Sequence, residues 1–193
     1  KNKKYTWKKG DRYTSLSSSG ISQTRKIYAF WVEWDDTSFA SLEQNISSID
    51  SVILEELTLS WDSLRILDEK KFQRTLDFLR NQEKDIEIIP LINNFNQETN
   101  VWDKYTLEGI LSDPEKRKKF EGDIITFLEK YHLKSINFDF EEIDEKTFPL
   151  YLQFLEEMSE KIHSISWTVS INVPLGNDTY DFEELASRVD QIF

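Results

Sequence analysis

The chain has 193 residues, enough for one substantial domain with a sizeable core. Its 36 Asp and Glu outnumber its 24 Lys and Arg, and the resulting formal charge of −12 disfavours binding to nucleic acid and to anionic membrane surfaces. The absence of cysteine excludes disulfides and thiol nucleophiles, and the two histidines, His132 and His163, make a histidine-rich metal site or a Ser-His-Asp triad a poor interpretation. The sequence therefore implies neither a metal nor an organic cofactor.

Residues 1–25 form a segment of their own. The first twenty are basic and rich in serine, and we interpret the segment as a linker or as what remains after an upstream part was trimmed. A domain is expected over residues 26–193.

From residue 26 onward, short apolar runs alternate with longer stretches of helical spacing. A strand is predicted over 26–34. A helix follows it, on the face formed by Phe39, Leu42, Ile46 and Ile49, with Asp36 or Thr37 as its N-cap. A second strand is expected over 51–59. Another helix then leads to a third strand over 86–93.

The second half of the chain continues this alternation. Residues 112–115 predict a capping box with proline in the first turn of a long helix. Strands are expected over 135–141 and 166–173, with a helix between them. A shorter helix is predicted over 182–189, and residues 191–193 indicate the start of a sixth strand.

The alternation of strands and helices, with near-continuous apolar strands, predicts a parallel sheet covered by helices. Two architectures fit: a doubly wound open sheet and a closed (β/α)8 TIM barrel. No glycine-rich nucleotide turn follows a strand, and only five glycines are present, which weakens the dinucleotide-binding version of the open sheet. A complete barrel needs roughly 200–250 residues, so we expect this chain to cover about strands 1 to 6 of one.

The stretch 135–142 carries the strongest chemical signal. Side chains alternate faces along a strand, so Asn137, Asp139 and Glu141 should share the face opposite to the apolar Ile136 and Phe138. Burying a carboxyl lowers the stability of the fold, and proteins accept this cost mostly at functional sites. An ionised Asp139 would help to keep Glu141 protonated as an acid. An acidic loop, or Asp139 as a helix cap, explains the composition about equally well, and the alternation tips the interpretation towards a site.

Residues 134–141, KSINFDFE, resemble the signature of glycoside hydrolase family 18, Asp-Gly-hydrophobic-Asp-hydrophobic-Asp-aromatic-Glu, on the fourth barrel strand. Residues 28–36, 38–42, 93–96 and 111–117 extend the resemblance to a bacterial branch in which the barrel precedes a polysaccharide deacetylase and a family 2 glycosyltransferase in a trifunctional membrane protein. The resemblance covers about residues 26–193 and implies a chitinase-like catalytic barrel whose C-terminal part lies beyond the chain.

The resemblance also implies a mechanism. Glu141 would protonate the glycosidic oxygen of a β-linked N-acetylglucosamine polymer, and the substrate's own acetamido oxygen would attack the anomeric carbon, with retention of configuration. Asp139 would orient the acetamide and stabilise the oxazolinium. The sequence departs from the signature at Asn137, where an aspartate is usual, and at Ser135, where glycine is usual. Asn137 can hydrogen-bond Asp139 but cannot share a proton with it.

Other polar and aromatic residues are candidates for substrate binding. Trp34 ends the first strand and could stack on a sugar or pack under a loop. Asn94 follows the third strand and needs amide partners, from the substrate or from a local turn. Asn172 should face inward on the fifth strand, between Ile171 and Val173. We place Asn137 in the same binding set.

Three functions remain open on the sequence. The first is an extracytoplasmic glycosidase that acts on an N-acetylglucosamine-containing glycan. It would be secreted or held at the cell surface, tethered to the membrane by a removed N-terminal segment, and this domain itself would not contact the membrane. The second is a non-catalytic glycan-binding barrel that serves attached deacetylase or glycosyltransferase domains. The third is an unrelated α/β scaffold in which the acids serve structure.

Overall fold

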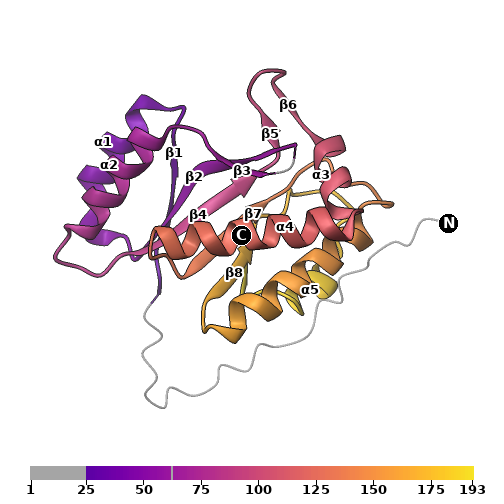
Figure 1. Cartoon of the computed structure of the whole chain (residues 1–193). Helices are drawn as coiled ribbons and strands as arrows, with labels where there is room; N and C mark the ends of the chain where they lie inside the picture. Colours follow the sequence, from indigo (N-terminus) through magenta and orange to yellow (C-terminus); the bar gives the residue numbers. More distant parts are fainter. Residues whose placement is uncertain (1–24, 62) are drawn as a thin grey trace, which may run out of the picture.

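The computed structural model describes residues 25–61 and 63–193, so the predicted linker, apart from Arg25, lies outside the described residues. Figure 1 shows the arrangement of the elements. The helices are α1 (Asp36–Asn45), α2 (Glu69–Arg80), α3 (Lys104–Leu111), α4 (Pro114–Lys130), α5 (Phe148–Ser164) and α6 (Phe182–Ala186), with a 3₁₀ turn η1 over Ile46–Ser48. The strands are β1 (Tyr28–Val32), β2 (Ser51–Ser60), β3 (Ser63–Ile66), β4 (Glu87–Asn93), β5 (Phe95–Asn96), β6 (Val101–Trp102), β7 (Ser135–Asp139), β8 (Thr168–Ile171) and β9 (Gln191–Ile192).

The main sheet has the strand order β1-β2-β4-β7-β8-β9, and all of these neighbours are parallel. Spatial order therefore follows chain order throughout. A doubly wound sheet requires a reversal of this order at a switch point, and the described strands have none. The architecture is thus a half-barrel of the (β/α)8 type, as the sequence predicted, with β3 added antiparallel to β2.

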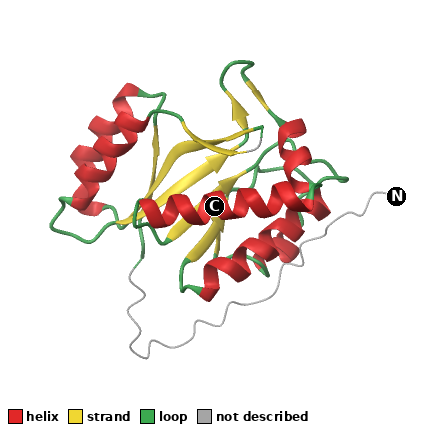
Figure 2. Ribbon diagram, in the orientation of Figure 1, coloured by secondary structure: helices red, strands yellow, loops and turns green. Residues whose placement is uncertain are grey.

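The two faces of the curved sheet carry separate apolar clusters. The larger cluster lies between the strands and the helices, where Phe138 packs edge-on against Phe154 of α5 with ring centroids 5.1 Å apart. Figure 2 shows the helices flanking the strands. The smaller cluster comprises Ile53, Ile89 and Leu91, with Tyr28 and Phe193 against it. It lies on the opposite face, which is the lumen of the half-barrel.

Strand β2 carries an irregularity directly after Glu55, and its two glutamates point to different faces. Glu55 pairs with Leu91 and Leu57 pairs with Ile92, so Glu56 is an extra residue in a β-bulge. Leu91 belongs to the lumen cluster, which places Glu55 on the lumen face. Glu56 is fully buried on the helix side, where its carboxylate accepts a hydrogen bond from the backbone N–H of Asp68.

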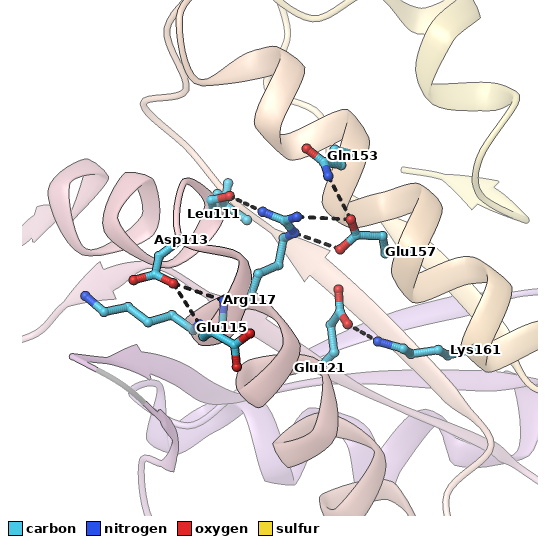
Figure 3. A network of polar contacts seen from close by, with 9 residues as sticks. Leu111, Asp113, Glu115, Arg117, Glu121, Gln153, Glu157 and Lys161 are labelled. Carbon is cyan, nitrogen blue, oxygen red and sulfur yellow. Dashed lines mark hydrogen bonds and ion pairs between the residues drawn. The ribbon is translucent and has the colours of Figure 1, made fainter.

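The helices α4 and α5 are joined by ion pairs as well as by aromatic packing. The guanidinium of Arg117 donates to both carboxylate oxygens of Glu157, at 2.7 and 3.0 Å, and also to the carbonyl oxygen of Leu111 (Figure 3). One turn further on, Lys161 pairs with Glu121. These contacts fix α5 beside α4 and thereby support β7, which lies between them in the chain.

Most helix starts and ends lie close to their predicted positions, but two caps were assigned wrongly. Asp35 caps α1, rather than Asp36 or Thr37, and Asp113 caps α4 by accepting from the N–H groups of Glu115 and Lys116. Proline 114 occupies the first turn of α4 as predicted. The helix expected over 182–189 ends earlier, at Ala186, and the strand expected over 135–141 ends at Asp139.

Candidate active site

Asp139 is the last residue of β7 and lies on the lumen face. It pairs in register with Asn93 of β4, and its carboxylate accepts a hydrogen bond from the side chain of Asn172, just beyond β8. Burial raises the pKa of Asp139 to about 6, the hydrogen bond from Asn172 opposes this shift, and the negative charge of Glu55 adds to it. The predicted inward orientation of Asp139 and Asn172 is therefore confirmed.

Glu141 lies two residues beyond the strand, half-buried at the rim of the half-barrel. Its backbone is held on both sides by one side chain: Asn94 Oδ1 accepts from the N–H of Glu141 at 2.9 Å, and Asn94 Nδ2 donates to its carbonyl oxygen at 3.0 Å. Burial raises the pKa of the Glu141 carboxyl, and the charges of Asp139 and Glu142 raise it further. Each effect favours a protonated carboxyl, which suits a general acid.

The residues around Glu141 fix its direction. Phe140 is fully buried on the helix side, with its ring 5.8 Å from that of Tyr151. The hydroxyl of Tyr180 donates to the carbonyl oxygen of Phe140 at 2.8 Å. Glu142 then adopts a left-handed conformation with φ of 57°, which is costly for a residue with a Cβ. Glu141 is thus set between an anchored aromatic residue and a sharp turn.

Asn137 does not have the neighbours that the sequence suggested. Its side chain is fully buried, and its Nδ2 donates to the hydroxyl of Ser170 on β8 at 3.0 Å. Its Oδ1 has no hydrogen-bond partner among the described residues. Asn137 lies two residues before Asp139 on β7, below it in the lumen, and a direct contact of its side chain with substrate stays a prediction.

Asn94 has the amide partners that the sequence called for. It is 1% exposed, and both polar atoms of its amide are engaged by the backbone of Glu141. These two bonds hold the backbone of Glu141 in place, and a contact of Asn94 with substrate stays a prediction. Its neighbour Asn93 faces the lumen and donates to Glu55.

A cavity of about 620 Å³ opens in front of Asp139. Trp34 borders it and is 69% exposed, so its ring face is available for stacking, and Trp102 borders it from the β5–β6 hairpin. The other lining residues are Glu55, Leu67, Asn93, Phe95, Gln97 and Asn100. An aromatic wall beside polar side chains is the kind of surface that binds a sugar.

Glu55 is the site residue that sequence analysis missed. It lies on the lumen face of β2, accepts from Asn93 Nδ2 at 3.1 Å and accepts from the side chain of Trp34. Burial raises the pKa of its carboxyl, whereas these two hydrogen bonds lower it. The available signal was the Glu-Glu pair inside an otherwise apolar strand, because at least one of two adjacent acids must face inward.

A second hollow, of about 770 Å³, lies at the other end of the sheet, where Glu87 and Ser135 begin their strands. Catalytic groups of such barrels lie at the C-terminal ends of the strands, which is the end that carries Asp139. Within the described residues, no cluster of acids and histidines has the arrangement of a metal site. No helix in the same part of the chain is long and apolar enough to span a bilayer.

Comparison with known proteins agrees with this geometry. The model of the family described as "Glycosyl hydrolases family 18" matches residues 23–193. The uncharacterized glycosylase YvbX of Bacillus subtilis is 24% identical over 159 residues, which make up 82% of this chain and 45% of that protein. The chain therefore spans about half the length of this curated relative.

Solved structures with the same fold include a class V chitinase from Pseudomonas fluorescens Pf-5, with a TM-score of 0.76 and 17% identity over 86% of this chain and 52% of that one. The spore cortex-lytic enzyme SleL of Bacillus cereus matches with a TM-score of 0.73 and 16% identity, over 87% of this chain and 40% of that one. At these identities the likeness concerns the fold.

Proposed function

The chain belongs to glycosyl hydrolase family 18, and from this premise we propose that residues 26–193 are part of a catalytic barrel that cleaves β-linked N-acetylglucosamine-containing polysaccharide. The observation that carries the proposal is the joint placement of two acids at the C-terminal end of β7. Asp139 is half-buried on the lumen face and lines a cavity with an aromatic wall, and Glu141 stands at the rim of the half-barrel in an environment that favours its protonated form.

In the proposed reaction, Glu141 gives its proton to the glycosidic oxygen as the bond to the anomeric carbon breaks. The acetamido oxygen of the same sugar attacks that carbon and forms a cyclic oxazolinium ion. Water then opens the ring from the face that the leaving group occupied, with the Glu141 carboxylate as general base, so configuration is retained. Asp139 is suited to the cation because its carboxylate lies on the lumen face with Asn172 to orient it.

Two asparagines support these acids in the proposal. Asn94 keeps the backbone of Glu141 in place through its paired hydrogen bonds. Asn172 holds Asp139 and has its own buried Oδ1 without a partner among the described residues, so this oxygen is free to accept from the sugar. Trp34 would stack against a sugar ring at the cavity mouth.

We place this activity outside the cytoplasm. The formal charge of −12 suits a neutral glycan better than an anionic polymer, and such polysaccharides are cell-surface materials. The solved relatives include an enzyme named for lysis of the spore cortex. Tethering through an N-terminal segment belongs to the same proposal.

Product analysis tests the function. The full-length protein is incubated with N-acetylglucosamine oligomers of 1,4 and of 1,6 linkage, beside Glu141→Gln. We expect cleavage of one linkage by the natural protein and a loss of about 10²–10⁴-fold with the variant, because general acid catalysis contributes on that order. Binding without cleavage by the natural protein would favour a glycan-binding barrel over a hydrolase.

A further inference from the structure

Glu55 and Asp139 are two carboxyls that border the same cavity from different strands. Asn93 connects them: it donates its Nδ2 to Glu55 Oε1 at 3.1 Å and pairs with Asp139 across β4 and β7. No lysine or arginine is among the described residues that line this cavity. Two acids in a cavity without a cation cannot both be ionised without mutual repulsion.

The hydrogen bonds indicate which of the two carries the charge. Glu55 accepts from Asn93 and from Trp34, and two donors favour its ionised form. Among the described residues, Asp139 accepts from Asn172 alone, and it is the more deeply buried of the pair. The first proton should therefore leave Glu55, and its charge then opposes the ionisation of Asp139.

No second carboxyl on β7 itself faces the lumen beside Asp139. The next inward position on β7 is Asn137, whose amide donates to Ser170 and has no proton to exchange. On β2, Glu55 faces the lumen in register with Leu91, and the bulge at Glu56 lets Leu57 return to the helix side.

We propose that Glu55 is a positioning residue of this site: its ionised carboxylate opposes the ionisation of Asp139 in the free enzyme, and a cationic intermediate beside Asp139 overcomes this opposition. The inference rests on the proposed function and adds to it the residue that sets the protonation of Asp139. When the cation forms, its charge outweighs that of Glu55, and any Asp139 that still carries its proton releases it to water.

Other charged and titratable groups face this pair. Glu141 and Glu142 follow β7, Glu33 follows β1, and the hydroxyls of Tyr151 and Tyr180 approach from α5 and from the segment before α6. Glu33 is paired with Lys71 at 2.7 Å, which removes much of its effect. Glu55 is the carboxylate whose charge acts on Asp139 most directly.

The test is a pH titration of Asp139, followed through the carboxyl carbon by NMR in the full-length protein with labelled aspartate and with Asp139→Asn for assignment. Glu55→Gln keeps an acceptor for Asn93 and removes the charge. Glu56→Gln is the matched control, because it removes a neighbouring buried carboxyl on the other face of the same strand. We expect the midpoint of Asp139 near 6 to fall by about half a pH unit or more in Glu55→Gln and to stay in place in Glu56→Gln.

An unchanged midpoint in Glu55→Gln, or an equal shift in both variants, overturns the proposal. Hydrolysis is measured separately on the oligomer that the natural protein cleaves, where the acid limb of the pH profile of kcat/KM should move to lower pH only in Glu55→Gln. If the midpoint of Asp139 moves in Glu55→Gln but neither the natural protein nor any variant cleaves an oligomer, the coupling between Glu55 and Asp139 stands and the proposed hydrolase function fails.

Discussion

Asp139 and Glu141 are two residues apart in the chain and have different environments. Asp139 ends a strand inside the lumen, whereas Glu141 sits past the strand end under the control of Asn94. Strand alternation was enough to predict that both face away from the apolar Phe138 and Phe140. It could not show that Asn137 turns to Ser170, because that choice depends on a hydrogen bond to a strand 33 residues away.

Asn94→Ala tests whether Asn94 holds the backbone of Glu141 in the position that catalysis needs. Loss of both hydrogen bonds frees the backbone of Glu141, so we predict a fall in kcat of about 10–100-fold with a smaller change in KM. Steady-state kinetics on the cleaved oligomer measure both, and circular dichroism checks that the variant is folded. Asn94→Asp restores the acceptor for the N–H of Glu141 but not the donor, and it should recover only part of kcat. A change confined to KM would show instead that Asn94 contacts the substrate.

Asp139→Asn tests, through the free energy of unfolding, how much the burial of the Asp139 carboxyl destabilises the fold. Its folded-state pKa of about 6 lies above the ordinary 3.8, so the folded protein holds the proton more tightly, and the free energy of unfolding falls as pH rises from about 4 to 6. The variant removes this loss. We predict that it is more stable than the natural protein at pH 7, by roughly 1–3 kcal/mol, and that the difference vanishes below pH 4. Urea unfolding at pH 7 and at pH 4 measures it, and a variant less stable at pH 7 would contradict it.

At the scale of elements, the strands that alternate with helices were predictable because each is a nearly continuous apolar run. The elements that were missed are β3, the β5–β6 hairpin and α3. Each is short, and its place is set by partners rather than by pattern: β3 pairs back on β2, and Phe95 packs against Trp102 with ring centroids 5.2 Å apart. Trp102 is therefore fixed at the cavity wall.

Helices α4 and α5 depend on the bidentate pair of Arg117 and Glu157, in which the guanidinium is 6% exposed. Arg117→Met leaves Glu157 without its cation and the carbonyl of Leu111 without its donor. We predict a loss of about 2 kcal/mol in the free energy of unfolding at pH 7. Lys119→Met is the control on the same helix, because its pair with Asp123 is exposed, and it should cost less than about 0.5 kcal/mol.

The pH dependence of the difference in unfolding free energy between the natural protein and Arg117→Met is a further check. The hydrogen bonds from Arg117 lower the pKa of Glu157 to about 2 from its ordinary 4.5. The stabilisation is therefore complete above pH 4.5 and is lost as pH falls towards 2. The gap between the natural protein and Arg117→Met should narrow over that range, and a gap that stays constant would show that the loss comes from packing.

At the scale of the whole molecule, the strand order gives the half-barrel one lumen, and the chain carries a formal charge of −12. Composition alone predicted the acidic surface and the class of partner it excludes. The lumen arrangement needed the structure, because β2 is apolar on both faces and its sequence does not show which of Glu55 and Glu56 faces the lumen.

This acidity leads to a prediction about partners. Affinity for a neutral N-acetylglucosamine oligomer should change less than about twofold between 50 and 500 mM salt, because stacking and hydrogen bonds are not screened. Isothermal titration calorimetry at both concentrations measures it, with a sulfated glycan of equal length as the matched anionic ligand. Tighter binding of the anionic ligand would contradict the account.

The central claim is that Glu141 acts as the acid in a substrate-assisted, retaining hydrolysis at the end of β7. The most direct measurement is the configuration of the first product, followed by proton NMR immediately after the full-length protein is mixed with an N-acetylglucosamine oligomer. The account predicts that the β-anomer forms first and that Glu141→Gln forms neither anomer at a comparable rate. A first product in the α-configuration, or undiminished cleavage by Glu141→Gln, would contradict it.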